Sequence, residues 1–243
     1  MSTVVRRSAL RLVACLVCAV PVVILSAMWI HLPWDRYAKF LGAYSPERLL
    51  HGAVWTLPLS AFVVPHMGEI RPTIAFVLVL FVPYALLRDP LRAVLVFFLG
   101  HISSTLIVAF GIVVGSALGW STATNYYGAR DMGISAGLAA ISGALVVLLL
   151  ASRAKVLGVL LLGASIWFFL HMMIGHPTGR IAGIEHFLAL AAGAAFELVA
   201  RIRAASSTNG VQGTSDGADD VHPPLPETPS GSWQSIEEMS PTR

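Results

Sequence analysis

Charged residues are scarce in this chain. Only 12% of its 243 residues are Asp, Glu, Lys or Arg, whereas 56% are hydrophobic and the mean hydropathy is +0.75. Soluble domains carry about 25% charged residues, so this composition excludes them and indicates a protein that crosses a membrane several times. The net charge of +3 does not indicate nucleic acid binding, because the basic residues stand between apolar runs and form no patch. We therefore expect no nucleic acid partner.

The sequence also contains only two cysteines and no internal repeat. The two cysteines, Cys15 and Cys18, both fall inside the first apolar run, where a thiol behaves as a small hydrophobic group. A redox pair or a zinc site is therefore not expected, and nothing else in the sequence predicts a metal or a cofactor. The sequence shows no internal repeat, which argues against transporters, because many of them are built from inverted repeats.

Six apolar runs are interpreted as membrane-spanning helices, since about 20 residues of helix cross the hydrocarbon core. The runs cover residues 9–30, 73–87, 93–118, 132–151, 156–173 and 181–200. The predicted fold class is therefore an all-α membrane protein, a bundle of six transmembrane helices.

The segment 33–71 decides the topology, because it contains a further apolar stretch broken by a histidine and a proline. If this segment does not cross the membrane, all the basic clusters between the spans fall on one side. These clusters lie at residues 6–11, 88–92, 153–155 and 201–203. The positive-inside rule makes that side cytoplasmic. We therefore place the segment on the outer side, partly in the interface, and both termini in the cytoplasm of a multi-pass cell-membrane protein.

The chain divides into three parts by composition. Residues 1–8 form a short basic N-terminus, and residues 9–203 form the membrane domain. Residues 204–243 are rich in Ser, Thr, Gly, Pro and acidic residues and have no apolar periodicity. Such a segment cannot bury enough apolar surface to fold, so we expect a disordered cytoplasmic tail.

A serine and a histidine are predicted to lie at similar depths in the membrane. With a rise of 1.5 Å per residue, Ser135 lies about 7 Å past the loop residue Arg130, and His186 about 9 Å past Arg180. A serine hydroxyl becomes a nucleophile when a base takes its proton, and histidine is the usual base. The sequence thus predicts a Ser-His pair that acts on peptide bonds inside the bilayer.

Small residues surround both members of the pair. Gly133 and Ala136, on either side of the serine, belong to the backbone expected to support an oxyanion, because amide groups in the first turn of a helix have no partner within it. Small side chains also let transmembrane helices pack closely. The residues expected to serve this packing are Gly137, Ala189 and Gly193.

Two motifs resemble those of the rhomboid family of intramembrane serine proteases, particularly its divergent bacterial rhomboid-like members. Gly133-Ile-Ser-Ala136 is similar to the family's Gly-x-Ser-Gly, and His186-x-x-Ala-x-x-x-Gly193 is similar to its His-x-x-Gly-x-x-x-Gly. Arg48-Leu-Leu resembles the start of the family's first outer loop. The order of the spans is also similar, with the serine at the start of the fourth and the histidine near the start of the sixth.

The resemblance covers residues 9–203 and implies a rhomboid-like bundle of six helices. It implies that Ser135 is the nucleophile and His186 the base of a serine-type endopeptidase, which needs no cofactor. The implied partners are a transmembrane protein substrate and the lipid bilayer. The residues predict no oligomeric state and no particular substrate.

Two positions depart from the family pattern. Ala136 stands where the family has its second glycine, and the usual His-x-x-x-Asn of the second span is not found, because His66 is followed four residues later by Ile70. An inactive rhomboid-like protein that binds transmembrane segments is therefore an alternative interpretation.

Other ionisable residues suggest a further alternative. An ionisable residue inside a span is a functional candidate by default, so an ion-coupled transporter would use His101, His186 and Glu185. We expect His101 to lie too deep to join the serine. Glu185 follows a different helix face from its neighbour His186, and Asp131 is expected to cap the serine helix.

The topology is tested by thiol accessibility. Asn125→Cys is expected to react with a membrane-impermeant reagent in intact cells, because residue 125 is placed outside. Arg153→Cys is expected to react only after permeabilisation, because residue 153 is placed in the cytoplasm. Modification of residue 153 in intact cells would contradict the six-span topology. A background variant without Cys15 and Cys18 removes competing thiols.

Overall fold

The computed structural model describes five parts of the chain: residues 13, 42–63, 69–131, 133–175 and 177–212. Several predicted features lie outside these residues, namely the first span apart from Val13, residues 33–41, His66 and residues 213–243. The described part is helical, with one isolated backbone bridge between Tyr44 and Asp131.

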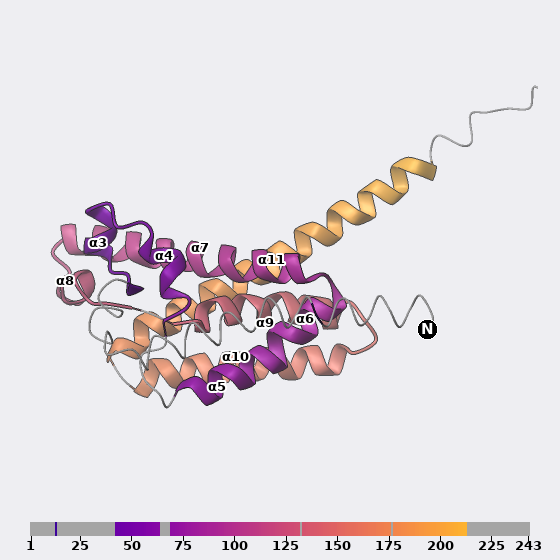
Figure 1. The fold of residues 1–243 in the computed structure, drawn as a ribbon, viewed down its shortest axis with the longest axis horizontal. Helices are drawn as coiled ribbons and strands as arrows, with labels where there is room; N and C mark the ends of the chain where they lie inside the picture. The colour runs from indigo at the N-terminus through magenta and orange to yellow at the C-terminus, as the bar shows by residue number, and fades with distance from the viewer. Residues whose placement is uncertain (1–12, 14–41, 64–68, 132, 176, 213–243) are drawn as a thin grey trace, which may run out of the picture. The chain divides into compact units, whose positions relative to one another are not determined.

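The helices follow one another closely along the chain (Figure 1). Their bounds are α3 Pro46–Leu50, α4 Thr56–Ser60, α5 Ile70–Phe76, η2 Val77–Phe81, α6 Val82–Leu87, α7 Pro90–Ala117, α8 Ser121–Tyr127, α9 Ser135–Leu150, α10 Lys155–Gly175 and α11 Pro177–Gln212. The bundle belongs to a unit formed by Met1–Ile202, and α11 continues past it into a second unit that starts at Arg203.

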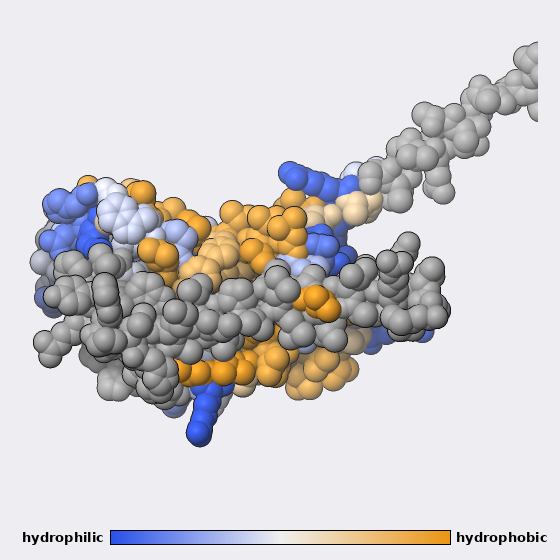
Figure 2. Space-filling view, viewed as in Figure 1, coloured by the Kyte–Doolittle hydropathy of each residue, from blue (hydrophilic) through white to orange (hydrophobic). Residues whose placement is uncertain are grey.

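Four helical stretches in the described part are long and apolar enough to cross a membrane. They are Ile70–Leu87, Pro90–Ala117, Lys155–Ile174 and Gly179–Ser206. α9 is apolar but has only 16 residues. Figure 2 shows hydrophobic residues over the middle of the bundle and hydrophilic residues mostly toward its ends. The prediction of an all-helical membrane protein with several spans is confirmed, whereas the count of six stays a prediction.

The first of these stretches contains a wider turn. The amide of Val82 donates to the carbonyl of Val77, five residues earlier, instead of to its neighbour four residues earlier. The next residue, Pro83, has no N–H and cannot bond to the carbonyl of Val79. The π-helical turn η2 therefore separates α5 from α6 within one continuous span, and such turns are frequent at functional sites.

Helix α9 packs against its neighbours at positions with small side chains. In Figure 1, α7, α9 and α10 run side by side, with α9 in contact with both of the others. A Cβ atom added at Gly100 of α7 would overlap Ala140 of α9, and one added at Gly193 of α11 would overlap the carbonyl of Ala140. The backbones approach as closely as glycine allows, as the small-residue pattern predicts.

A buried carboxylate joins the opposite end of α11 to the start of α7. Glu197 is fully buried and pairs with Arg88, with Arg92 at 3.0 Å and with Arg201 at 3.4 Å. The hydroxyl of Tyr84 on α6 donates to the same carboxylate at 2.8 Å. Because a buried charge is tolerated only when it is paired and hydrogen-bonded, this cluster fixes α11 against the turn between α6 and α7.

The close approach of α9 and α11 is tested by adding one methyl group. Gly193→Ala is expected to lower the free energy of unfolding by about 1–3 kcal/mol, because the new Cβ forces two backbones apart. Gly163→Ala on α10 is the matched control, since a Cβ there would meet no atom within 4 Å. Thermal unfolding in detergent measures both variants. Equal unfolding temperatures for the two would contradict the packing described.

Candidate functional site

Ser135 is the first residue of α9. The chain reaches it through Gly133, whose φ of +147° lies in a region that side-chain-bearing residues rarely adopt. The helix cap is Ile134, with no side-chain hydrogen bond. The prediction that Asp131 caps this helix is therefore wrong, because Asp131 lies before the cap position and pairs with the backbone of Tyr44 instead, at 2.9 and 3.0 Å.

His186 lies on α11 with 4% of its surface exposed. Its Nδ1 bonds to the carbonyl of Ala182, one turn earlier, and the ring of Phe169 lies against it with the two centroids 5.1 Å apart. A carbonyl only accepts hydrogen bonds, so Nδ1 carries the proton and Nε2 keeps its lone pair in the neutral ring. Nε2 is buried and has no partner, which is the state that a general base requires.

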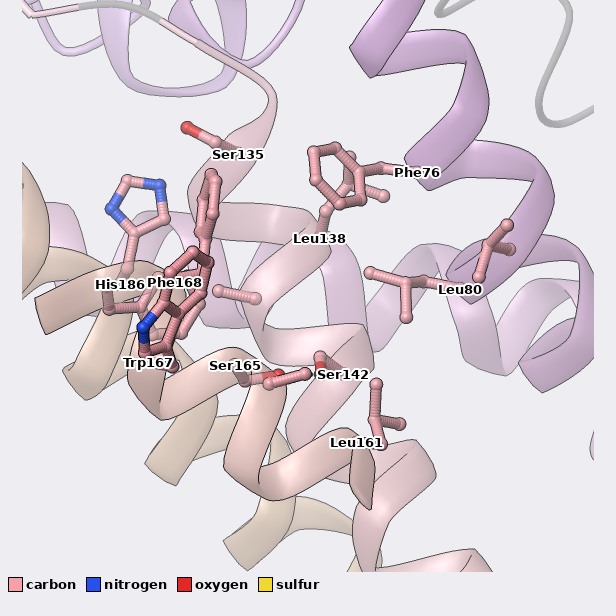
Figure 3. Close-up of a pocket in the computed structure, with 14 residues that line it drawn as sticks. Phe76, Leu80, Ser135, Leu138, Ser142, Leu161, Ser165, Trp167, Phe168 and His186 are labelled. Atoms are coloured by element: carbon pink, nitrogen blue, oxygen red, sulfur yellow. Dashed lines mark hydrogen bonds between the residues drawn. The ribbon is translucent and has the colours of Figure 1, made fainter. Parts of the chain in front are cut away.

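Ser135 and His186 line the same apolar cavity of about 320 Å³. Figure 3 shows the serine hydroxyl and the histidine ring on one side of it, with Phe76 and Leu80 on the other. Two turns further along α9, the hydroxyl of Ser142 is hydrogen-bonded to the hydroxyl of Ser165, with the two oxygens 2.9 Å apart. The cavity therefore brings residues of α5, η2, α9, α10 and α11 around one space.

A second cavity of about 140 Å³ is lined by the same pair and by polar residues. These polar residues are Tyr44, Glu69, His101, Asp131 and Glu185. Ser135 is exposed, and within the described residues no hydrogen bond joins it to His186. The structure thus places Ser135 and His186 where an apolar and a polar cavity adjoin, without a hydrogen bond between them.

Glu185 contributes to the polar cavity, although it was expected to follow another face than His186. Its carboxyl accepts from Thr105 at 2.6 Å and from the hydroxyl of Tyr44 at 3.3 Å. The two observations agree, because α7 and the segment around Tyr44 enclose this turn of α11 from a second side. Glu185 can therefore point away from His186 and still line the same cavity.

Tyr44 connects the two carboxyl groups of the site. Its hydroxyl also lies 3.3 Å from Asp131. Burial, followed by the nearby carboxyls of Asp131 and Glu185, raises the pKa of the Tyr44 phenol well above its ordinary value. The phenol therefore keeps its proton and stays a donor that holds the segment leading to Ser135 against α11.

His101 also lines the polar cavity, so the expectation that it lies too deep to join the serine is wrong. The reason is helix length, because α7 has 28 residues and α9 only 16. At 1.5 Å per residue these lengths are about 42 and 24 Å. Because Gly100 of α7 packs on Ala140 of α9, the first residue of α9 lies near the level of the middle of α7.

Ser60, the last residue of α4, links His101 to the approach to α9. Its hydroxyl lies 3.0 Å from His101 Nε2, and its carbonyl accepts from the amide of Gly133 at 3.0 Å. Sequence reasoning did not single out Ser60, Tyr44 or Thr105. A lone hydroxyl in an interfacial segment or a span gives no signal in the sequence, because only the folded chain supplies its partner.

The other predicted site residues take packing positions. Ala136 is buried next to the serine, and a Cβ at Gly137 would overlap the ring of Phe97. Ala189 is fully buried, beside the close approach at Gly193. Within the described residues, no group of three or more His, Cys, Asp or Glu is arranged to hold a metal ion.

Comparison of the chain with family descriptions, with curated proteins and with solved structures finds no match. The resemblance to rhomboid proteases therefore rests on the sequence motifs and on the predicted order of the spans.

The backbone before Ser135 is tested at Gly133. Gly133→Ala is expected to slow the reaction of Ser135 with a fluorophosphonate about tenfold to a hundredfold, because small displacements of a nucleophile have such effects. The new Cβ is strained at this φ and would lie 3.3 Å from the serine Oγ. Gly52→Ala, at φ +84° with no atom within 4 Å, is a control with comparable strain away from the site. Equal rates would show that Gly133 does not position the serine.

Proposed function

We propose that this protein is an intramembrane serine-type endopeptidase that cleaves membrane-anchored proteins through Ser135 and His186. One observation carries the proposal: the unpartnered Nε2 of a buried histidine belongs to a ring that shares two cavities with an exposed serine. A buried polar atom without a partner is costly, and it is retained where chemistry uses it. The proposed setting is the cell membrane, with both termini in the cytoplasm.

The proposed reaction follows from the chemistry of the two side chains. His186 Nε2 takes the proton of Ser135 as the serine oxygen attacks the peptide carbonyl, and then gives it to the leaving amine. The amides of the first turn of α9 have no partner within the helix and are suited to stabilise the oxyanion. Water then hydrolyses the acyl-enzyme. No cofactor or metal takes part in these steps.

The apolar cavity indicates how a substrate would reach the serine. Its walls come from α5 and η2 on one side and from α10 on the other. Between these walls the rings of Phe76 and Phe168 are in contact, with their centroids 5.8 Å apart. Its lining is almost entirely apolar, which suits a transmembrane segment arriving from lipid. Helical substrates must unwind locally, because a helix shields its peptide carbonyls with its own hydrogen bonds and side chains.

Two other functions have specific support. An inactive protein that binds transmembrane segments is favoured by Ala136 and by the lack of a hydrogen bond, within the described residues, between Ser135 and His186. An ion-coupled transporter is favoured by His101 and Glu185, which are buried in candidate spans. The inactive binding protein leaves the unpartnered Nε2 of His186 without a role, and the transporter leaves Ser135 without one, so we rank both below the protease.

The proposal is tested with a fluorophosphonate probe on the purified protein in detergent. The wild type is expected to be labelled, and Ser135→Ala and His186→Ala to lose labelling, because the probe needs an activated serine. Ser142→Ala is the matched control, since Ser142 lines the same cavity but bonds to Ser165.

Cleavage of a reporter protein with one transmembrane segment completes the test. Ser135→Ala is expected to abolish cleavage, whereas Ser142→Ala is expected to retain it. Absence of labelling together with binding of the reporter by wild type and Ser135→Ala alike would favour the inactive binding protein. Proton-dependent uptake that disappears in His101→Ala would favour the transporter.

A further inference from the structure

His101 is the second buried histidine of the polar cavity, and the proposed acylation step does not use it. Its ring is 2% exposed. Nε2 lies 3.1 Å from the carbonyl of Leu57 and 3.0 Å from the hydroxyl of Ser60. Since the carbonyl can only accept, Nε2 carries the proton. The Ser60 hydroxyl donates to the same carbonyl, so it accepts from Nε2.

The remaining nitrogen of this ring, Nδ1, is buried without a partner. In the neutral ring it holds a lone pair, as does Nε2 of His186. Each histidine thus uses one nitrogen to fix its tautomer on a carbonyl and has one acceptor left over. Both rings line the same small cavity, although they come from α7 and α11.

The cavity suits a molecule that can donate two hydrogen bonds. Its volume of about 140 Å³ exceeds the roughly 30 Å³ that one water takes in the liquid. Its lining includes the ionisable side chains of Tyr44, Asp131 and Glu185, in contrast to the apolar lining of the larger cavity. A water that donates to His101 Nδ1 and to His186 Nε2 satisfies both acceptors, which otherwise stay buried without a partner.

We propose that this cavity holds the hydrolytic water of the reaction and that His101, on α7, is the residue that positions it. The inference rests on the proposed protease function. It assigns acylation to Ser135 with His186, and it assigns the delivery of water to His101 together with His186. The polar cavity thereby supplies water to a site whose other side opens on an apolar space.

The step balances as follows. The acyl-enzyme is an ester of Ser135 whose carbonyl carbon is attacked by the water oxygen while His186 Nε2 takes one water proton. His101 Nδ1 accepts a hydrogen bond from the other proton and fixes the direction of attack. The tetrahedral intermediate then collapses, the serine oxygen leaves with the proton from His186, and the product is a carboxylic acid.

Two substitutions distinguish the role of Nδ1 of His101 from the role of its Nε2. In His101→Gln the side-chain amide reaches the place of Nε2, so the bond to Leu57 is kept and the acceptor toward the cavity is lost. In His101→Asn the shorter amide places an oxygen near Nδ1, so the acceptor is kept and the bond to Leu57 is lost. Ser60→Ala removes one partner of Nε2 without touching the cavity acceptor.

The measurement is the release of p-nitrophenol from an activated apolar ester by the full-length protein in detergent. The wild type is expected to turn over continuously. His101→Gln is expected to give a burst of one equivalent and then a rate about a hundredfold lower, with the acyl group found on Ser135 by mass spectrometry. Hydroxylamine, a strong nucleophile, is expected to restore turnover. His101→Asn and Ser60→Ala are expected to turn over without a burst.

Each other outcome contradicts the inference. Unchanged turnover in His101→Gln would show that the residue does not position water. Loss of the burst itself in His101→Gln, with an unfolding temperature equal to the wild type, would assign it to acylation. A burst in His101→Asn as large as in His101→Gln would assign the effect to the bond with Leu57. Absence of any reaction at Ser135 in the wild type would overturn the proposed protease, a result distinct from all of these.

Discussion

The site depends on the contact of three backbones at Gly100, Ala140 and Gly193, where no further Cβ atom fits. This contact sets how α7, α9 and α11 lie along one another. Ser135 lies just over one turn from it on α9, His186 lies two turns from it on α11, and His101 is next to it on α7. Because close packing transmits displacement rather than absorbing it, a change at this contact would alter all three side chains together.

Hydrogen bonds then orient the side chains of the site, whose helices are positioned by the contact at Gly100, Ala140 and Gly193. The segment that leads to α9 is tied to Tyr44 through its backbone and to Ser60 through the amide of Gly133. Tyr44 and Ser60 in turn bond to Glu185 and His101. In a low-dielectric environment such bonds are stronger than in water, and they are costly when broken. A short segment outside the long helices thus holds the backbone before Ser135 and contacts His101 in the polar cavity.

The sequence predicted what local pattern determines and missed what tertiary pairing determines. Within the described residues, the apolar runs at 73–87, 93–118, 156–173 and 181–200 predicted the four candidate spans, because such runs follow from spacing along one helix. Close contacts at Gly137 and Gly193 involve the small residues on which the packing prediction rests. The depth of His101 was predicted wrongly because it depends on the lengths of α7 and α9 relative to each other. The role of Asp131 was also wrong, since its partner Tyr44 is 87 residues away. No local sequence pattern predicts that Tyr44 is the partner of Asp131.

The buried ion cluster at Glu197 has a consequence for motion. α11 is anchored at two levels, by Glu185 to Thr105 and by Glu197 to Arg88 and Arg92. Sliding or rotating this helix would separate the buried Glu197 carboxylate from its arginine partners. The aromatic contact between α5 and α10 involves no charge and breaks at far lower cost. We therefore expect α5 and α10 to separate more readily than α11 can leave its place in the bundle.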